Sequence, residues 1–286
     1  MKNQILKSYA KINLFLNVAK KSKNESLHNI QSLVFLINII DKIFIRKSKE
    51  KRDKIKISGK FRKHVNKFDN SIINSLRVLR NTGIIKKKEK YEIILKKNIP
   101  VFSGLGGGTS NAGTIINFFL KKKKISKNKI KYFSKYVGSD LGLFLRSKRI
   151  LQKNLFSTEA YKKKYLFYFI VVYPFLKSST KEIYSKLDKF DSIKNKNYVL
   201  NYSRLELVKM LKMEKNSLEN VVISKFPIIR KILLNLRFTK NCQFSRITGS
   251  GSACFGLYLN KRDASLALKQ IKKKFPDFWC VISKTI

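Results

Sequence analysis

Residues 100–112 form the stretch of this sequence best suited to chemistry. Four glycines occupy five positions there, between a strand-like run at residues 91–96 and a helix-like run at residues 111–120. These glycines are Gly104, Gly106, Gly107 and Gly108. Glycine adopts left-handed backbone conformations and has no Cβ to obstruct a ligand, so the amides of such a loop can surround an anion. The helix, expected from about Thr109, adds unpaired donors and the positive end of its dipole. The loop therefore predicts a phosphate-binding site, and an ordinary tight turn is the alternative.

The loop differs from the two commonest nucleotide-binding motifs. A Walker loop has a lysine before its serine or threonine, whereas Gly108 is followed directly by Thr109 and Ser110. The dinucleotide fingerprint needs a glycine at its last position, which Thr109 occupies here. The sequence therefore predicts a phosphate cradle of another kind.

Lys11 is a candidate functional cation. It lies in a mostly apolar strand-like run, residues 8–18, in which alternation places Lys11 and Asn13 on the same face. An ordinary exposed strand lysine is the alternative. Lys11 stands outside the lysine runs of the chain, which favours a specific role.

Asp140 is a candidate functional acid. A helix is expected to begin at residues 125–127, to run to Val137 and to end at Gly138, after which Asp140 precedes an extended apolar run at residues 141–145. The chain is poor in acidic residues, so an acid at the start of an apolar strand is informative. A turn aspartate or a helix N-cap is the alternative.

The rest of the sequence must position these groups, and it alternates strand-like with helix-like runs. Residues 246–257 contain a second turn of small residues between strand-like flanks. Residues 42–47 and 54–58 alternate like a pair of strands. Further strands are expected at residues 165–173 and 279–283, and further helices after Asp69-Asn70-Ser71, from Thr180, and over residues 261–275. The alternation predicts an α+β chain, and a weak change of composition near residues 149–160 predicts two domains, residues 1–155 and 156–286.

The formal charge of +47 suggests a polyanionic partner by itself. The excess is mostly lysine, however, and its runs are scattered, as at residues 86–88, 162–164 and 272–274. A nucleic-acid-binding protein usually concentrates its charge on one face and uses arginine for phosphate contacts. We interpret most of this charge as a solvated surface and expect no dedicated nucleic-acid partner.

The remaining composition bounds the class of protein. The chain has 286 residues, 43% of them hydrophobic, which is enough for one large domain or two medium ones. Its apolar runs are too short to span a bilayer, and the N-terminus leads directly into a strand rather than a signal peptide. Three cysteines without metal-ligand spacing, Cys242, Cys254 and Cys280, fit a reduced cytoplasmic compartment.

Three motifs occur in order along the chain: residues 9–14, 100–112 and 248–253. Together they resemble the three-motif signature of the GHMP small-molecule kinases. Residues 25–32, residues 138–145 and the Asp69-Asn70-Ser71 segment are similar to elements of one branch of that family, which acts on a cytidine-diphosphate ester of methylerythritol. The resemblance spans nearly the whole chain in collinear order.

The resemblance implies a fold and an activity. The fold would have an N-terminal ATP-binding and catalytic domain and a C-terminal ferredoxin-like α/β sandwich domain. The activity would be transfer of the γ-phosphoryl group of ATP, with Mg²⁺, to the 2-hydroxyl of the methylerythritol moiety. That step belongs to non-mevalonate synthesis of the isoprenoid precursor isopentenyl diphosphate.

The resemblance also implies residue roles. Asp140 would be the general base and Lys11 its partner, because a nearby cation keeps a carboxylate ionised and aligned. The implied ATP-binding residues are Asn70, Lys97, Pro100, Gly104, Leu105, Gly106, Gly107, Gly108, Thr109 and Ser110. Ser110, at the helix start, is also a candidate magnesium ligand. The implied substrate-binding residues are Asn13, His28, Thr180, Tyr184, Gly249 and Ser250. Among them His28 would hydrogen-bond the cytosine and Tyr184 would stack on it.

Two departures from the family pattern keep alternatives open. Leu27 stands where an aromatic residue usually forms half of a cytosine sandwich, and Phe102 stands where a small residue is usual. Another GHMP kinase, of the homoserine or mevalonate type, is therefore one alternative. A basic RNA-binding protein on a related fold is another. A monomer or weak homodimer is the expected oligomeric state.

Overall fold

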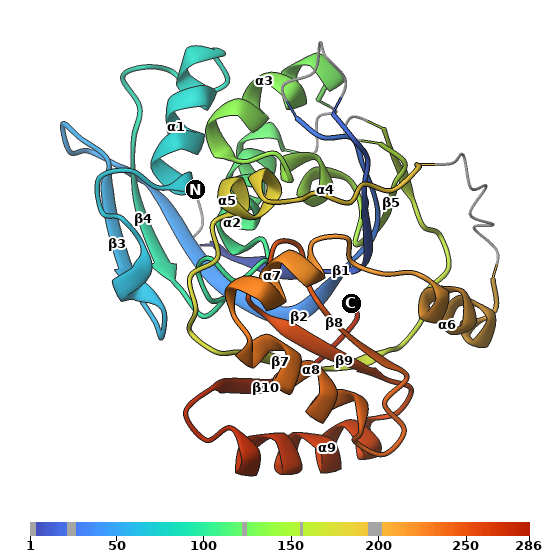
Figure 1. The fold of residues 1–286 in the computed structure, drawn as a ribbon. Coiled ribbons are helices and arrows are strands. Elements are labelled where there is room, and N and C mark those ends of the chain that lie inside the picture. Colours follow the sequence, from blue (N-terminus) through green and yellow to red (C-terminus); the bar gives the residue numbers. More distant parts are fainter. Residues whose placement is uncertain (1–3, 22–26, 122–124, 155–156, 194–201) are drawn as a thin grey trace. The chain divides into compact units, whose positions relative to one another are not determined.

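The structure is a computed structural model that describes residues 4–21, 27–121, 125–154, 157–193 and 202–286 (Figure 1). The chain divides into two compact units. The first unit comprises Met1–Ala10, Ile39–Val101 and Gly106–Ser147, and the second comprises Lys11–Asn38, Phe102–Leu105 and Lys148–Ile286. Segments of the two units alternate along the chain, so these units differ from the expected domains, residues 1–155 and 156–286. The assignment of ATP binding and catalysis to the first of those domains stays a prediction.

The elements alternate as an α+β chain. The strands are β1 (Gln4–Val18), β2 (Ile30–Ser48), β3 (Lys54–Ser58), β4 (Lys90–Lys96), β5 (Arg149–Gln152), β6 (Thr158–Ala160), β7 (Tyr168–Tyr173), β8 (Phe244–Ile247), β9 (Cys254–Tyr258) and β10 (Trp279–Lys284). The helices are α1 (Ser71–Asn81), α2 (Gly107–Leu120), α3 (Lys127–Val137), α4 (Leu141–Arg146), α5 (Thr180–Ser185), α6 (Arg204–Met213), α7 (Glu219–Lys225), α8 (Ile228–Arg237) and α9 (Lys261–Lys274), with a short 3₁₀ turn at Arg62–His64. No helix in these described ranges is long and apolar enough to cross a membrane.

The first sheet is built around the long strand β2. Its strand order is β3-β4-β2-β5-β6, and β1 also pairs with β2. The C-terminal part of β2 runs antiparallel to β4, while β3 runs parallel to β4 on its other side. The expected pairing of residues 42–47 with 54–58 is therefore wrong, because β4 lies between these strands. Alternation identifies the faces of a strand but not its neighbours.

The first unit has its own apolar core under helices α1, α2 and α3. Asn70 caps α1 by accepting hydrogen bonds from the amides of Ile72 and Ile73, and Ser126 caps α3. Ile72 and Leu76 of α1 pack with the apolar side of α2 and with side chains of β2 and β4. The helix starts expected at Asp69-Asn70-Ser71 and at residues 125–127 are confirmed.

Residues 141–145 form helix α4 rather than the expected strand. A short apolar run does not distinguish a buried strand from a buried helix. Here the helix packs across α2 at Gly113, where a Cβ would lie 2.9 Å from the Phe144 side chain. Leu141 and Leu143 are both buried, so one helical turn hides the apolar side chains that suggested a strand.

The second sheet has the order β10-β7-β9-β8, and its neighbouring strands are antiparallel. Strand β7 is followed by helices, then by β8 and β9, then by α9 and β10. This β-α-β-β-α-β order with outer strands β10 and β8 is the expected ferredoxin-like arrangement. Strand β7 begins at Tyr168, three residues later than the expected start, and the terminal helix and strand lie where expected.

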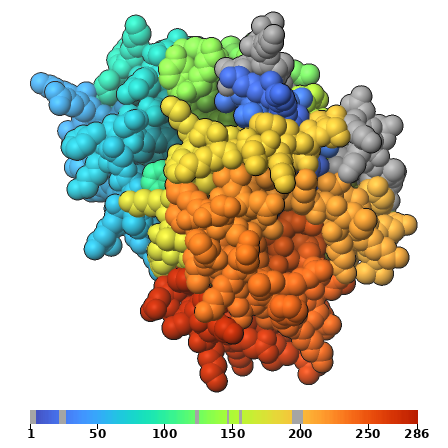
Figure 2. All heavy atoms as spheres, in the orientation of Figure 1, coloured from blue at the N-terminus to red at the C-terminus, as the bar shows by residue number. Residues whose placement is uncertain are grey.

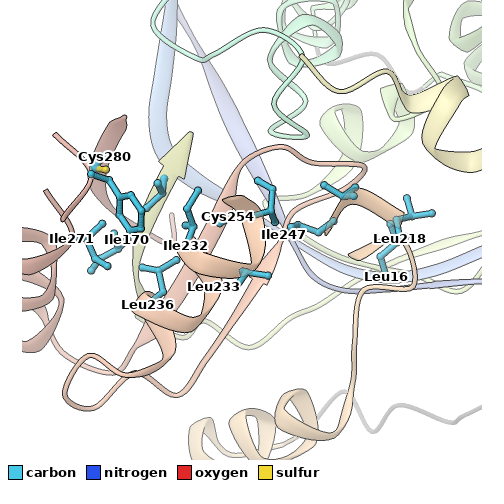
Figure 3. Packing of buried hydrophobic residues seen from close by; sticks show 14 of the residues in the cluster. Leu16, Ile170, Leu218, Ile232, Leu233, Leu236, Ile247, Cys254, Ile271 and Cys280 are labelled. Carbon is cyan, nitrogen blue, oxygen red and sulfur yellow. The ribbon is translucent and has the colours of Figure 1, made fainter. Parts of the chain in front are cut away.

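Helices α8 and α9 pack against this sheet and against each other. Their part of the chain is orange and red in Figure 2. Ile232, Leu233 and Leu236 of α8 point toward apolar side chains of the sheet and of α9, including Ile170 and Ile271 (Figure 3). This packing forms the core of the second unit and supports the turn between β8 and β9, which carries the third motif.

We expect Leu236→Ala to lower the free energy of unfolding by about 2–5 kcal/mol, because Leu236 is fully buried and truncation leaves a cavity. Leu234→Ala is the matched control, since Leu234 lies on the same helix but is 49% exposed. Its loss should stay below about 1 kcal/mol. Urea unfolding followed by circular dichroism measures both, and equal losses would contradict the assignment of this core.

Candidate active site

The N-terminus of α2 contains the predicted phosphate-binding amides. Gly106 is the N-cap, in the left-handed region at φ 69°, and the helix begins at Gly107, two residues before the expected start. The first amide bonded within the helix is that of Ser110, which donates to the Gly106 carbonyl at 2.9 Å. The amides of Gly107, Gly108 and Thr109 therefore precede the helical hydrogen bonds, and a glycine N-cap has no side chain to accept from them.

Asp140 lies in the same unit as this helix and stands at the N-cap of α4, without a capping hydrogen bond from its side chain. Gly138 brings its segment to the first turn of α2. A Cβ at Gly138, which has φ 120°, would lie 2.5 Å from Thr109 Oγ1. The predicted base and the predicted phosphate donors thus come from segments that touch, although Asp140 begins a helix rather than a strand.

The second unit joins the first half of the glycine loop to the other two motifs. The Lys11 amide donates to the Leu105 carbonyl at 3.0 Å. Gly104, at φ 78°, packs so closely on the Thr248 carbonyl oxygen that a Cβ would overlap with it. Segments expected from sequence order to form one site therefore do meet within this unit.

Lys11 and Asn13 share a buried polar cluster, as their spacing predicted. Lys11 is 4% exposed, and its Nζ donates to Asn13 Oδ1. The amide of Asn13 donates to Thr248 Oγ1 at 3.1 Å, and its side-chain nitrogen donates to Ser32 Oγ at 2.8 Å. Lys11 Nζ also lies 3.1 Å from the Cβ position of Gly249. The alternative of an ordinary exposed strand lysine is wrong.

The third motif is held by residues that the sequence analysis did not identify. Asn216 donates to the carbonyls of Ile247 and Gly249 at 3.1 and 2.9 Å. Glu219 accepts from the Ile247 amide at 3.0 Å, and burial raises the pKa of its carboxyl group. Neither residue has a recognisable spacing in the sequence, because both act on a turn far away in the chain.

Thr180 and Ser250 also meet, as the substrate-binding prediction requires. Their hydroxyl oxygens lie 2.9 Å apart, and Ser178 Oγ donates to the Ser250 carbonyl at 2.6 Å. Helix α5, which begins at Thr180, is thereby attached to the third motif. Tyr184 lies one turn further along this helix.

An aromatic cluster surrounds His28. The Phe190 ring stacks on the imidazole with centroids 5.3 Å apart, and the Tyr184 ring lies tilted at 5.8 Å. His28 Nδ1 is 3.1 Å from the Ala19 carbonyl oxygen, which can only accept. This geometry assigns the proton of a neutral imidazole to Nδ1 and makes Nε2 the acceptor. Leu27 is 49% exposed, and residues 25 and 26 of the same motif lie outside the described residues.

Phe190 was missed because it lies in an irregular segment with no motif around it. Only its position in the folded chain indicates a role in the site. It stacks on a residue whose role the resemblance implied, and it supplies a ring beside His28 where Leu27 supplies none.

The remaining predicted ATP residues have clear structural partners. Asn70 caps α1, and Pro100 is a buried residue ahead of the glycines. Lys97 is 2% exposed, and its Nζ bonds to Asp41 and Asn111. Ser110 Oγ accepts from Ser8 Oγ at 2.7 Å. Direct contacts of these residues with ATP stay a prediction, as does the pairing of Lys11, in the second unit, with Asp140, in the first.

Comparison with known proteins defines the class. The family model of the GHMP kinases C terminal matches residues 203–277. The fold matches a crystal structure of 4-(cytidine 5'-diphospho)-2C-methyl-D-erythritol kinase with a TM-score of 0.70 at 18% identity, covering 99% of this chain and 100% of that one. It matches a homoserine kinase from Cytophaga hutchinsonii with a TM-score of 0.74 at 18% identity, covering 100% and 96%. The fold is that of the GHMP kinases.

Curated relatives narrow the class to one branch. A protein from Pelagibacter ubique named 4-diphosphocytidyl-2-C-methyl-D-erythritol kinase is 39% identical over 284 residues, 98% of either chain. A protein of the same name from the Wolbachia of Brugia malayi is 28% identical over 302 residues, covering 98% of this chain and 97% of its own. The chain belongs to the 4-diphosphocytidyl-2-C-methyl-D-erythritol kinase family.

We expect Gly104→Ala to destabilise the protein by more than left-handed strain alone, because its Cβ overlaps the Thr248 carbonyl. Gly83→Ala is the matched control. Gly83 has φ 70° and nothing within 4 Å of its Cβ position, so its cost is strain alone, roughly 1–2 kcal/mol. Urea unfolding compares the two, and equal losses would contradict a tight contact between the glycine loop and the third motif.

Proposed function

We propose that this protein transfers the γ-phosphoryl group of ATP to the 2-hydroxyl of 4-diphosphocytidyl-2-C-methyl-D-erythritol. The reaction yields the 2-phosphate and ADP as a step in non-mevalonate synthesis of isopentenyl diphosphate. The observation that carries the proposal is the 39% identity to a kinase of this name across 98% of both chains. The glycine loop, Lys11 and Asp140 supply the chemistry that such a reaction needs.

ATP is proposed to place its phosphates at the N-terminus of α2. The amides of Gly107, Gly108 and Thr109 are donors that precede the helical ladder, and the helix dipole adds positive potential there. Phosphoryl transfer proceeds through a loose transition state, so most of the acceleration comes from positioning and electrostatic stabilisation. A rigid row of amides suits that task because it needs no reorganisation as charge shifts toward the leaving group.

Asp140 is proposed as the general base. Its carboxylate takes the proton of the attacking 2-hydroxyl while the new O–P bond forms and ADP leaves with the electrons of the broken bond. Lys11 is proposed as the cation that keeps this carboxylate ionised and offsets charge on the transferring group. Its burial beside Asn13 supports a specific role, because burying a charged side chain costs free energy of folding, and Lys11 is only 4% exposed.

Magnesium is proposed to accompany ATP. Ser110 offers a hydroxyl oxygen on the first turn of α2, and oxygen ligands are what Mg²⁺ prefers. No cluster of three or more His, Cys, Asp or Glu side chains that could hold a metal occurs in the part of the chain that the structure describes. This donor set fits an ion held largely by phosphates and water, with Ser110 as a protein ligand. When bound, Mg²⁺ neutralises charge that develops on the phosphates.

The cytidine end of the substrate is proposed to bind at the aromatic cluster of His28, Tyr184 and Phe190. Nε2 of His28 is an acceptor, which matches the exocyclic amino group of cytosine. Ring faces of Tyr184 and Phe190 suit the faces of a nucleobase. Asn13 is proposed to hold the methylerythritol end, Thr180 to lie near the substrate pocket, and Gly249 and Ser250 to close the site. Cytoplasmic localisation and a monomeric or weakly dimeric state complete the proposal.

We expect Asp140→Asn to abolish phosphoryl transfer and to leave ATP binding nearly unchanged, because the amide cannot accept the hydroxyl proton. Phosphorus NMR with ATP, magnesium and the proposed acceptor measures the loss of the new phosphate monoester. Full activity of the variant would contradict the base assignment. Turnover of homoserine or mevalonate, with none of the proposed acceptor, would instead identify a different GHMP kinase.

We expect Phe190→Ala to raise the KM for the cytidine substrate by roughly tenfold, since base–aromatic stacking contributes about 1–3 kcal/mol. The KM for ATP should not change. Phe238→Ala is the matched control because Phe238 is 82% exposed. Steady-state kinetics of both variants test this, and an unchanged acceptor KM in Phe190→Ala would place the base elsewhere.

A further inference from the structure

An ion pair is buried in the first unit directly beneath the start of α2. Lys97 follows strand β4 and is 2% exposed, and Asp41 of β2 is fully buried. Lys97 Nζ lies against the first residue of the helix, since a Cβ at Gly107 would be only 2.8 Å from it. A cation at this position is repelled by the positive end of the helix dipole, so its placement calls for a reason.

Asp41 accepts a hydrogen bond from each of four donors. Its Oδ1 accepts from the amides of Asn98 and Ile99 at 2.6 and 2.8 Å. Its Oδ2 accepts from Lys97 Nζ and from Asn111 Nδ2, the latter at 2.9 Å. The carboxylate therefore fixes the chain just before the glycine loop and, through Asn111, the helix that follows the loop.

The network continues from Asn111 to the candidate magnesium ligand. Asn111 Oδ1 accepts from Lys97 Nζ at 3.1 Å, and its Nδ2 also donates to Ser8 Oγ at 2.9 Å. Ser8 Oγ in turn donates to Ser110 Oγ at 2.7 Å. Ser8, Ser110 and Asn111 are each at most 2% exposed. An unbroken series of buried hydrogen bonds thus runs from Asp41 to the Ser110 hydroxyl, entirely within one unit.

A buried ion pair is a poor means of stabilising a fold, because desolvation offsets most of its attraction. Burial alone lowers the pKa of the Lys97 ammonium group, and the Asp41 carboxylate opposes that shift. At this location the neutrality of the pair matters more for phosphate binding than the contribution of the pair to the stability of the fold. An unpaired carboxylate under the loop would repel phosphate, whereas the pair is neutral and leaves the amides and dipole to attract it.

We propose that Asp41, Lys97, Asn111 and Ser8 are positioning residues that hold the Ser110 hydroxyl and the glycine-loop amides for phosphate binding, and that their charge balance sets the affinity for ATP. In this inference Lys97 acts through the loop, in place of the direct contact with ATP that the resemblance implies. The inference rests on the proposed function only in taking ATP as the nucleotide, and it does not depend on the acceptor.

A double-mutant cycle on the ion pair tests the charge balance. The dissociation constant of ATP is measured by calorimetry, without acceptor, for the wild type, Lys97→Met, Asp41→Asn and the double variant. Lys97→Met leaves an uncompensated carboxylate, and we expect it to weaken ATP binding by roughly tenfold or more. The double variant is neutral again and should recover most of that loss. If Lys97 contacted ATP directly, the double variant would bind as weakly as Lys97→Met, which would overturn the inference.

Ser8→Ala tests the hydrogen bonds that link Asn111 to Ser110 through Ser8, without changing any charge. It also keeps the inference testable if a charge variant fails to fold. We expect a lower kcat and a higher magnesium requirement for ATP binding, with a thermal midpoint close to that of Ser75→Ala. Ser75 is the matched control, being fully buried in α1 and donating only to the Ser71 carbonyl. Equal kcat and equal magnesium dependence in the two variants would overturn the role of Ser8.

Intact ATP binding by the wild type without turnover of the acceptor would contradict the proposed function alone.

Discussion

The unpaired amides at the N-terminus of α2 are the constraint on which the rest of the site depends. Backbone donors at a helix start need a partner, and in α1, α3 and α6 a side chain provides it, from Asn70, Ser126 and Ser203. Helix α2 instead begins after Gly106, which has no side chain to accept a capping hydrogen bond. The positively charged Lys97 beneath these amides is balanced by Asp41. Glycine at position 106 thus serves two ends: it adopts the left-handed conformation at the start of α2, and it supplies no side chain to cap the helix.

Much of this arrangement could be predicted from the sequence because it depends on local chemistry. Glycine spacing predicted the loop that leads into α2, cap residues identified the starts of α1 and α3, and alternation placed Lys11 and Asn13 on one face. Each of these signals is written in neighbouring residues. Order along the chain added that three motifs belong together. The hydrogen bonds of Lys11 with Leu105 and of Asn13 with Thr248, all in the second unit, agree with it.

The errors and omissions arose where distant parts of the chain decide the outcome. Residues 141–145 fit a strand or a helix equally well by periodicity, and packing on Gly113 of α2 selects the helix. The alternation of β2 and β3 would allow them to pair, yet β4, which follows both in the chain, lies between them in the sheet. Asp41 was missed for the same reason. It lies in an apolar run, and its four donors become neighbours only after folding.

The acid-poor composition gives these carboxylates unusual significance. The chain has 17 acidic residues against 64 lysines and arginines. Several of the described acids accept more than one hydrogen bond at low exposure. Asp53 accepts from the Arg80 guanidinium and the Tyr91 amide. Asp191 accepts from the Val18 amide and the Ser217 hydroxyl. A basic residue can replace an acid on a solvated face at little cost, but not where a carboxylate accepts buried donors. Where such donors are buried, as at Asp53 and Asp191, a carboxylate therefore remains despite the strong lysine bias. Asp140 sits at the start of a helix that it does not cap with its side chain. Its proposed role as general base therefore rests on the family resemblance and on the contact of its segment, at Gly138, with the first turn of α2.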